Sequence, residues 1–244
     1  MLELRYTTVS IIRVVPRRIF APIGDFPIGV FVFAKSLIQG VRNNMRAKIC
    51  GIKDLLSAKV AEEAGADFIG FVFYKKSQRY VNPDVAAVIS GQVHQSRKVG
   101  VFVDEELEHV NSIARRVQLD YVQLHGHEDA DYAAKIECPV IKAYNFDENF
   151  SAKEANDYPA EIILIDTCKK GFYGGTGETF DWRAAAEEVA KINKSVLIAG
   201  GVDEENIYEI NKIFHPFGVD VSSSLEVNHE KSIDKIKSFM KRIK

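Results

Sequence analysis

The residues of this 244-residue chain that could do chemistry stand where short apolar runs end. Cys50 lies at the end of the run 47–51, and Asp166 directly follows the run 162–165. A thiolate can remove a proton and a carboxylic acid can give one, so this pair could move protons within one substrate. Arg79 follows another apolar run, and its guanidinium could bind a carboxylate through two parallel hydrogen bonds.

A second group of residues could bind a phosphate. Adjacent glycines let backbone amides approach an anion, and short hydroxyl side chains add further donors. Such residues follow three successive apolar runs: Gly174, Gly175 and Gly177, then Gly200 and Gly201, then Ser222 and Ser223. Glycines also make turns at no steric cost, but three sets in succession favour phosphate binding over plain turns.

Eight apolar runs predict the elements that would position these residues. We expect buried parallel strands at 47–51, 67–73, 98–103, 121–124, 140–143, 162–165, 195–199 and 218–221. Amphipathic helical stretches lie between them, and the strand-to-strand interval of roughly 20 to 30 residues suits a βαβ unit. The pattern therefore favours an α/β fold, a (β/α)8 TIM barrel. The alternative is an open doubly wound sheet, but no G-x-G-x-x-G follows the first strand.

A barrel would gather the candidate residues at one end. Active sites lie at the carboxyl-terminal ends of the strands, and phosphate is often bound after strands 7 and 8. Barrel closure would place strand 6 on one side of that phosphate and strand 1 on the other. Asp166 and Cys50 would then flank the bound molecule, and Arg79, on the next strand, could meet a second anionic group.

Composition excludes several classes of function. A net charge of −2 gives no bulk attraction for nucleic acid, and no apolar run reaches the length of a membrane span. The three cysteines, Cys50, Cys138 and Cys168, form no C-x-x-C pair and suit a reducing, cytoplasmic compartment rather than a disulfide scaffold. No His and Cys spacing suggests a metal site. We therefore expect a small-molecule partner, with neither nucleic acid nor membrane.

Nine segments, in order along the chain, resemble phosphoribosylanthranilate isomerase of tryptophan biosynthesis. They are 48–52 (KICGI), 65–74, 76–80 (KSQRY), 99–103, 122–126 (VQLHG), 165–167, 174–182, 199–202 (AGGV) and 220–223 (DVSS). The resemblance spans about residue 46 to the carboxyl terminus.

The resemblance implies a ribulose-phosphate-binding barrel that acts as a monomer or homodimer, without metal or organic cofactor. The implied activity is the Amadori rearrangement of N-(5-phosphoribosyl)anthranilate to 1-(2-carboxyphenylamino)-1-deoxyribulose 5-phosphate. The family's general base falls on Cys50, its general acid on Asp166 and its anthranilate-binding arginine on Arg79. One departure is Ser224, which stands where the family commonly has glycine.

Both roles depend on how the surroundings shift the pKa of the side chain. A free thiol, with a pKa of about 8.5, is only a few per cent thiolate near neutral pH. We expect nearby positive charge, from Lys48 or Arg79, to favour the thiolate of Cys50. An aspartate acting as an acid needs burial or a neighbouring anion, such as substrate phosphate. His125 is expected either to border the substrate or to make structural hydrogen bonds, and Asp220 to orient the last loop.

Residues 1–44 differ from the rest of the chain. They contain six Arg and Lys residues against Glu3 and Asp25, and prolines interrupt any long helix. We expect a non-family amino-terminal extension that is disordered or precedes a mis-assigned start, with the catalytic barrel at 45–244. A transit peptide is the alternative for this Arg-rich, acid-poor segment.

Two other functions remain open at the sequence level. One is a different phosphate-binding barrel enzyme. A pentose-phosphate epimerase would need metal-binding histidines and carboxylates, and indole-3-glycerol-phosphate synthase would need a catalytic lysine pair. The other is a non-catalytic barrel that only binds a sugar phosphate. The presence of both Cys50 and Asp166 argues against a binding protein.

Overall fold

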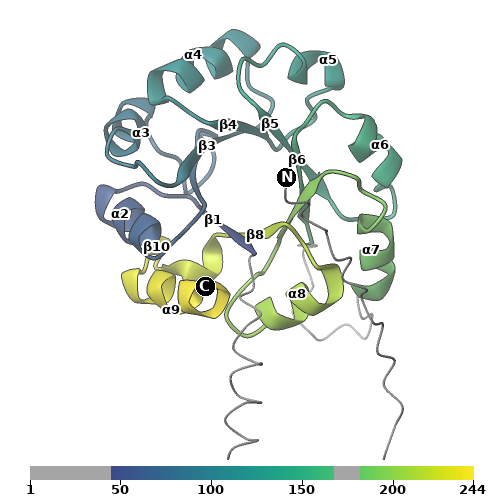
Figure 1. Cartoon of the computed structure of the whole chain (residues 1–244). Helices are drawn as coiled ribbons and strands as arrows, with labels where there is room; N and C mark the ends of the chain where they lie inside the picture. The colour runs from purple at the N-terminus through teal and green to yellow at the C-terminus, as the bar shows by residue number, and fades with distance from the viewer. Residues whose placement is uncertain (1–44, 168–181) are drawn as a thin grey trace, which may run out of the picture. The chain divides into compact units, whose positions relative to one another are not determined.

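The computed structural model describes residues 45–167 and 182–244 (Figure 1). The predictions made for residues 1–44 and for Gly174, Gly175 and Gly177 lie outside the described residues.

Eight parallel strands close into a barrel in the order of the chain, which confirms the predicted (β/α)8 fold. The strands are β1 (Arg46–Cys50), β2 (Phe68–Val72), β3 (Arg97–Phe102), β4 (Tyr121–Leu124), β5 (Val140–Asn145), β6 (Ile162–Asp166), β7 (Ser195–Ala199) and β8 (Gly218–Val221). Each overlaps a predicted apolar run.

Helices surround the strands as an outer ring (Figure 1). They are α2 (Leu55–Glu63), α3 (Pro83–Ser90), α4 (Leu107–Val117), α5 (Ala130–Ala133), α6 (Ala152–Asp157), α7 (Trp182–Val189), α8 (Ile207–Phe214) and α9 (Ile233–Ile243). Between β8 and α9 the chain forms a short 3-10 helix, η1 (Ser223–Leu225), and a hairpin of β9 (Glu226–Val227) and β10 (Glu230–Lys231).

Short polar side chains set where the first helices begin. Asp54 accepts a hydrogen bond from the Ser57 amide at 2.8 Å, and so caps the amino terminus of α2. Asn82 does the same for the Asp84 amide at 2.8 Å, with Pro83 as the first helical residue.

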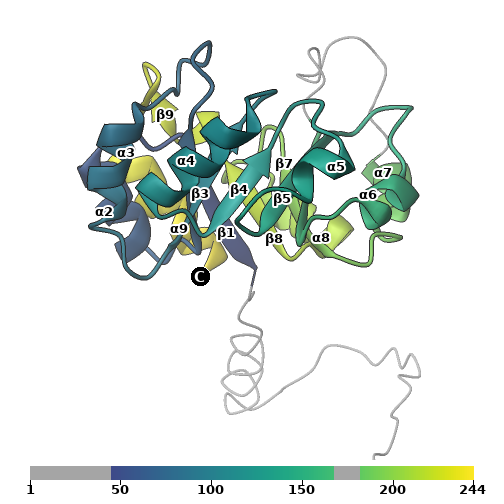
Figure 2. The same cartoon turned by 90° about the horizontal axis from the view of Figure 1, so that it is seen from above.

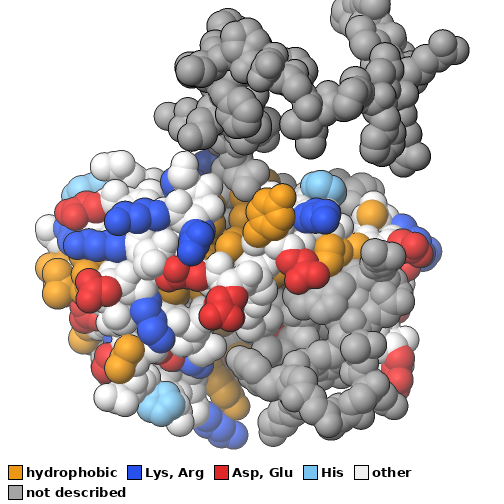
Figure 3. All heavy atoms as spheres, turned by 90° about the horizontal axis from the view of Figure 1, so that it is seen from below, with side chains coloured by type: hydrophobic (Ala, Val, Ile, Leu, Met, Phe, Trp, Pro, Cys, Tyr) orange, Lys and Arg blue, Asp and Glu red, His pale blue; other side chains and the backbone are white. Residues whose placement is uncertain are grey.

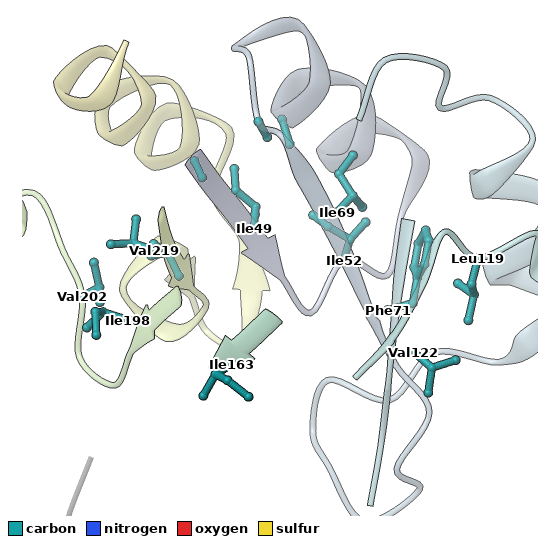
Figure 4. Packing of buried hydrophobic residues seen from close by; sticks show 14 of the residues in the cluster. Ile49, Ile52, Ile69, Phe71, Leu119, Val122, Ile163, Ile198, Val202 and Val219 are labelled. Atoms are coloured by element: carbon teal, nitrogen blue, oxygen red, sulfur yellow. The ribbon is translucent and has the colours of Figure 1, made fainter. Parts of the chain in front are cut away.

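Side chains point alternately to the two faces of each strand, and this divides the core into two layers. One face of each strand packs against the helices, where Ile49, Ile69, Phe71, Val122 and Ile198 meet helical side chains (Figure 4). The other face points into the barrel, which is filled by a separate cluster of nine residues that includes Phe68, Tyr121 and Leu164. Because side chains alternate with a period of two, the inward face of β1 carries Lys48 and Cys50.

The carboxyl-terminal ends of the strands form the upper edge in Figure 2, where β9 also lies. β1 begins at the opposite edge in that view. The residues that follow the strands and the β9–β10 hairpin therefore occupy the same end of the barrel.

The outer surface carries charge of both signs. On the face shown in Figure 3, Lys and Arg are interspersed with Asp and Glu, and hydrophobic side chains are scattered among them. Within 45–167 and 182–244, no helix is long and apolar enough to cross a membrane.

Candidate active site

A cavity of about 270 Å³ opens at the carboxyl-terminal end of the barrel. Its lining includes every predicted site residue that the structure describes, namely Cys50, Arg79, Asp166, Gly200, Gly201, Ser222 and Ser223. It also includes four further polar side chains: Ser77, Gln123, His125 and Asp220. The closed barrel thus brings together residues from β1, β2, β4 and β6 to β8 and from the loops that follow them.

Cys50 ends β1 beside a buried ion pair. The Lys48 side chain is fully buried, and its Nζ lies 2.9 and 3.0 Å from the two carboxylate oxygens of Asp220 on β8. A Cβ atom placed on Gly70 of β2 would lie 2.9 Å from Cys50 Sγ and 3.2 Å from Lys48 Nζ. Gly70 therefore provides the space in which the thiol and the ammonium group approach each other.

Burial and charge act on the Cys50 thiol in opposite directions. Burial raises the pKa of Cys50 above its ordinary value, Lys48 lowers it through charge and hydrogen bonding, and Asp220 raises it again. Burial by itself would lower the pKa of Lys48, but Asp220 and Cys50 together raise it, so Lys48 stays charged. The positive charge expected next to Cys50 is therefore supplied by Lys48.

Asp166 ends β6 and lies close to a histidine. His125 Nε2 is 4.0 Å from Asp166 Oδ2, and His125 Nδ1 is 2.9 Å from Gln123 Nε2. An amide nitrogen donates and cannot accept, so Nδ1 accepts and the neutral ring carries its proton on Nε2, toward Asp166. Burial lowers the pKa of His125, although Asp166 opposes this, which favours the neutral ring.

Gln123 offers one more polar atom to the cavity. The residue is 1% exposed, and its Oε1 has no hydrogen-bond partner among the described residues. A buried amide oxygen without a partner is costly, so this atom is suited to accept a hydrogen bond from a bound molecule.

The loops after β7 and β8, which were predicted to bind an anion, form one side of the cavity. Gly200 and Gly201 have φ of +89° and +70°, a conformation that favours glycine. A Cβ atom on Gly201 would meet nothing within 4 Å, so backbone conformation, not space, requires glycine there. Ser222 Oγ donates to the Cys50 carbonyl at 3.1 Å and so ties this side to β1.

Ser224, the departure from the family pattern, does not line the cavity. Its hydroxyl donates to the Val202 carbonyl at 2.6 Å and joins the last two loops.

Arg79 is held against two elements. Its stem lies over Gly51, where a Cβ atom would come within 2.7 Å of Arg79 Cδ. Its guanidinium makes two hydrogen bonds to Glu226 on β9, at 2.7 and 2.8 Å. Burial would raise the pKa of Glu226, but Arg79 and Lys231 lower it to about 2, so the carboxylate is ionised.

Two further charged residues on the strands are held by ion pairs. The Nζ atom of Lys142 on β5 donates to the Gly126 carbonyl at 2.7 Å and to Glu128 at 2.9 Å, and Lys142 does not line the cavity. Outward residues on β5 alternate with inward ones, and Lys142 falls on the outward face. Asp220 pairs with Lys48 inside the barrel, and its role in orienting the last loop stays a prediction.

Sequence reasoning missed Glu226 and Lys231. They face each other across the two-residue turn of the β9–β10 hairpin, in which Asn228 and His229 both have positive φ. The signal that could have found them is the segment Glu-Val-Asn-His-Glu-Lys at 226–231, since asparagine in a two-residue connection favours a hairpin turn. Within the described residues, no group of three or more His, Cys, Asp and Glu side chains could hold a metal ion.

The fold and this cavity define a (β/α)8-barrel protein with a thiol, a carboxyl group, an arginine and glycine- and serine-containing loops at one end. The family of N-(5'phosphoribosyl)anthranilate (PRA) isomerase matches residues 47–242. The chain belongs to that family.

Individual relatives agree with this assignment. The N-(5'-phosphoribosyl)anthranilate isomerase of Listeria monocytogenes is 41% identical over 201 residues, which cover 82% of this chain and 98% of that protein. A solved phosphoribosyl anthranilate isomerase in complex with reduced 1-(o-carboxyphenylamino)-1-deoxyribulose 5-phosphate is 37% identical, with a TM-score of 0.72 over 82% of this chain and 98% of its own. A monomeric form of the dimeric enzyme from Thermotoga maritima is 38% identical, with a TM-score of 0.71 and the same coverage.

Proposed function

We infer that this chain converts N-(5'-phosphoribosyl)anthranilate into 1-(2-carboxyphenylamino)-1-deoxyribulose 5-phosphate, an aldose–ketose isomerisation of tryptophan biosynthesis. The observation that carries the inference is the meeting of Cys50, Asp166 and Arg79 in one cavity of a chain that belongs to this family. The solved relative that holds a reduced form of this product supports the same substrate class.

Asp166 is proposed as the general acid and Cys50 as the general base. Protonated Asp166 gives its proton to the ribose ring oxygen, the bond between that oxygen and C1 breaks, and a Schiff base forms between C1 and the anthranilate nitrogen. The Cys50 thiolate then removes the C2 proton, which leaves an enolamine. The enolamine takes up a proton at C1 and loses the C2 hydroxyl proton, which gives the ketone.

The remaining cavity residues bind the two ends of the substrate. The backbone amides around Gly200 and Gly201 and the hydroxyls of Ser222 and Ser223 are proposed to hold the phosphate. Gly174, Gly175 and Gly177 remain part of this proposal, although they lie outside the described residues. Arg79 is proposed to bind the anthranilate carboxylate. Substrate and product are isomers, so no net oxidant or reductant is consumed, and the proposed steps use only side chains of this chain.

We further propose that the enzyme is cytoplasmic and acts as a monomer or homodimer, with the sugar phosphate as its small-molecule partner. Analytical ultracentrifugation of the full chain tests the oligomeric state, and a larger assembly would contradict this proposal.

Replacement of either proton-transferring residue tests the mechanism. We expect Cys50→Ala and Asp166→Asn each to lower kcat by about 10²- to 10⁴-fold, the usual contribution of one acid–base group. The measurement is the loss of substrate fluorescence during turnover, with Cys138→Ser as a control that should keep wild-type kcat.

Growth of a tryptophan auxotroph that lacks this isomerase gives a second readout. The full chain should restore growth and its Cys50→Ala variant should not. Wild-type turnover in either active-site variant would contradict the residue assignments. Binding of the substrate by the wild-type chain without turnover would instead favour a sugar-phosphate-binding protein.

A further inference from the structure

Glu226 holds one edge of the Arg79 guanidinium in a defined orientation. Arg79 Nε lies 2.7 Å from Glu226 Oε1, and Arg79 Nη2 lies 2.8 Å from Glu226 Oε2, which is a bidentate pair. The Glu226 side chain is 6% exposed, whereas the Arg79 side chain is 30% exposed. The carboxylate is therefore buried behind the arginine, and the arginine faces the cavity.

A second cation completes this cluster. Lys231 Nζ lies 2.6 Å from Glu226 Oε1, and the Lys231 side chain is 2% exposed. Lys231 and Glu226 are directly opposite each other in the β9–β10 hairpin, so strand pairing fixes their separation. Two cations share one carboxylate, and the cluster carries one excess positive charge next to the cavity.

The same lysine joins the cluster to the proposed phosphate side. Lys231 Nζ donates to the Ser222 carbonyl at 3.0 Å, and Ser222 Oγ donates to the Cys50 carbonyl at 3.1 Å. The hairpin therefore links Arg79, the loop after β8 and the strand that carries Cys50.

The guanidinium geometry shows which edge is left for a ligand. Of its five N–H groups, Glu226 takes the one on Nε and one on Nη2. The edge formed by Nη1 and the second Nη2 hydrogen has no hydrogen-bond partner among the described residues. A planar carboxylate can occupy that edge through two parallel hydrogen bonds while Glu226 occupies the other.

We propose that Glu226 is a positioning residue for the isomerase reaction: it orients Arg79 so that the free guanidinium edge receives the substrate's aromatic carboxylate. Lys231 keeps Glu226 ionised and couples this site to the loop after β8. The inference rests on the proposed function, because it takes N-(5'-phosphoribosyl)anthranilate as the ligand.

The test is steady-state kinetics of the full-length Glu226→Gln variant with this substrate. We expect KM to rise about tenfold or more while kcat changes by less than about threefold, because the lost orientation affects carboxylate binding and not proton transfer. The matched control is Glu230→Gln on the same hairpin, whose side chain is 66% exposed and pairs only with Lys53 in the described structure. The control should keep the wild-type KM.

A substrate analogue without the carboxylate, N-(5'-phosphoribosyl)aniline, separates positioning from general structural damage. Wild type and Glu226→Gln should have the same KM for this analogue. An equal rise in KM for both substrates would overturn the proposal, as would an unchanged KM for the natural substrate. A lower KM would also overturn it, because Glu226 would then compete with the substrate for Arg79.

A conservative variant covers the case in which Glu226→Gln does not fold. Glu226→Asp keeps the negative charge but is one methylene shorter, so it should raise KM less than Gln while leaving the unfolding midpoint near that of wild type. An unchanged KM in Glu226→Asp, in a case where Glu226→Gln is unfolded, would overturn the proposal. Failure of the wild-type chain to turn over substrate would instead overturn the proposed function, on which this inference depends.

Discussion

Lys48 carries its charge inside the barrel, with Asp220 on one side and Cys50 on the other. An ammonium group is costly to bury unless it is paired, and here the pair also determines the electrostatic environment of the thiol. Lys48 stabilises a thiolate, whereas burial and the Asp220 carboxylate oppose it. Cys50 is therefore a stronger base once ionised, but it is less often ionised than a free thiol at the same pH.

This balance predicts the titration of Cys50 in the absence of substrate. Because the pKa of Cys50 is raised, the thiolate should form with a midpoint above about 8.5, the ordinary value for cysteine. Asp220→Asn removes a charge that opposes the thiolate, so its midpoint should fall below that of the wild-type residue. Ultraviolet thiolate absorbance measures both midpoints in a background with Cys138→Ser and Cys168→Ser.

The control for that titration is the same background with Cys50→Ala, which should show no thiolate transition once tyrosine absorbance is subtracted. A wild-type midpoint below the ordinary cysteine value, or a higher midpoint in Asp220→Asn, would contradict the electrostatic account.

At the scale of elements, each strand serves the site on one face and the core on the other. Gly70 on β2 faces inward and leaves room for Cys50 and Lys48, whereas Gly100 on β3 faces outward and leaves room for Leu119 and Phe102. Gly70 pairs with Val99 across β2 and β3, and Gly100 pairs with Phe71, so the two glycines lie at neighbouring register positions and on opposite faces of the sheet.

These two glycines predict opposite effects of alanine. Gly70→Ala should displace the Cys50 thiol, because the new Cβ would lie 2.9 Å from Sγ and 3.0 Å from Cys50 Cα. We expect kcat to fall by about 10- to 100-fold, as for other small misplacements of reacting groups. Gly100→Ala should leave kcat near wild type and lower the free energy of unfolding by about 1–3 kcal/mol through overpacking.

Kinetics and denaturant unfolding of both variants check this pair of expectations. A large loss of kcat in Gly100→Ala with none in Gly70→Ala would contradict the assignment of the two faces.

The sequence was most informative about the positions of strands and least informative about which distant side chains form ion pairs. Apolar runs located all eight strands, because strands buried on both faces have little polar content. The Lys48–Asp220 pair could not be read in the same way, since it depends on the register between β1 and β8. Arg79 and Glu226 are 147 residues apart, and only the folded barrel brings the hairpin to that arginine.

The partner of Asp104 also depends on the folded barrel. Asp104 precedes α4, which begins at Leu107 with Glu106 as its N-cap, and Asp104 has φ of +48°. Its carboxylate accepts hydrogen bonds from His127, in the loop after the next strand. A carboxylate that has a partner in a neighbouring loop is thus not available as a helix cap.

At the scale of the whole molecule, the segment from Met45 to the carboxyl terminus contains a closed barrel. All eight strands lie between Arg46 and Val221, and α9 packs beside α2 to complete the helical ring. We propose that residues 45–244 form the catalytic unit and that residues 1–44 are an extension outside it.

Removal of residues 1–44 tests that division. A chain that begins at Met45 should keep the thermal unfolding midpoint and kcat of the full chain, because every described cavity residue is retained. Differential scanning calorimetry and the fluorescence assay measure the two quantities. Loss of the unfolding transition, or of turnover, would assign the extension a part in the folded enzyme.

The pairing of β1 with β8 also affects the order in which the chain folds during translation. β1, which carries Cys50, emerges from the ribosome before the other seven strands. It pairs with β8, whose Asp220 lies 172 residues after Lys48 in the sequence. Contacts so distant in sequence form late, since long loops must close first. Cys50 is therefore synthesised early, before β8 is available to pair with β1 and close the barrel. The proposed proton-transfer site is assembled only when the last strand docks beside the first.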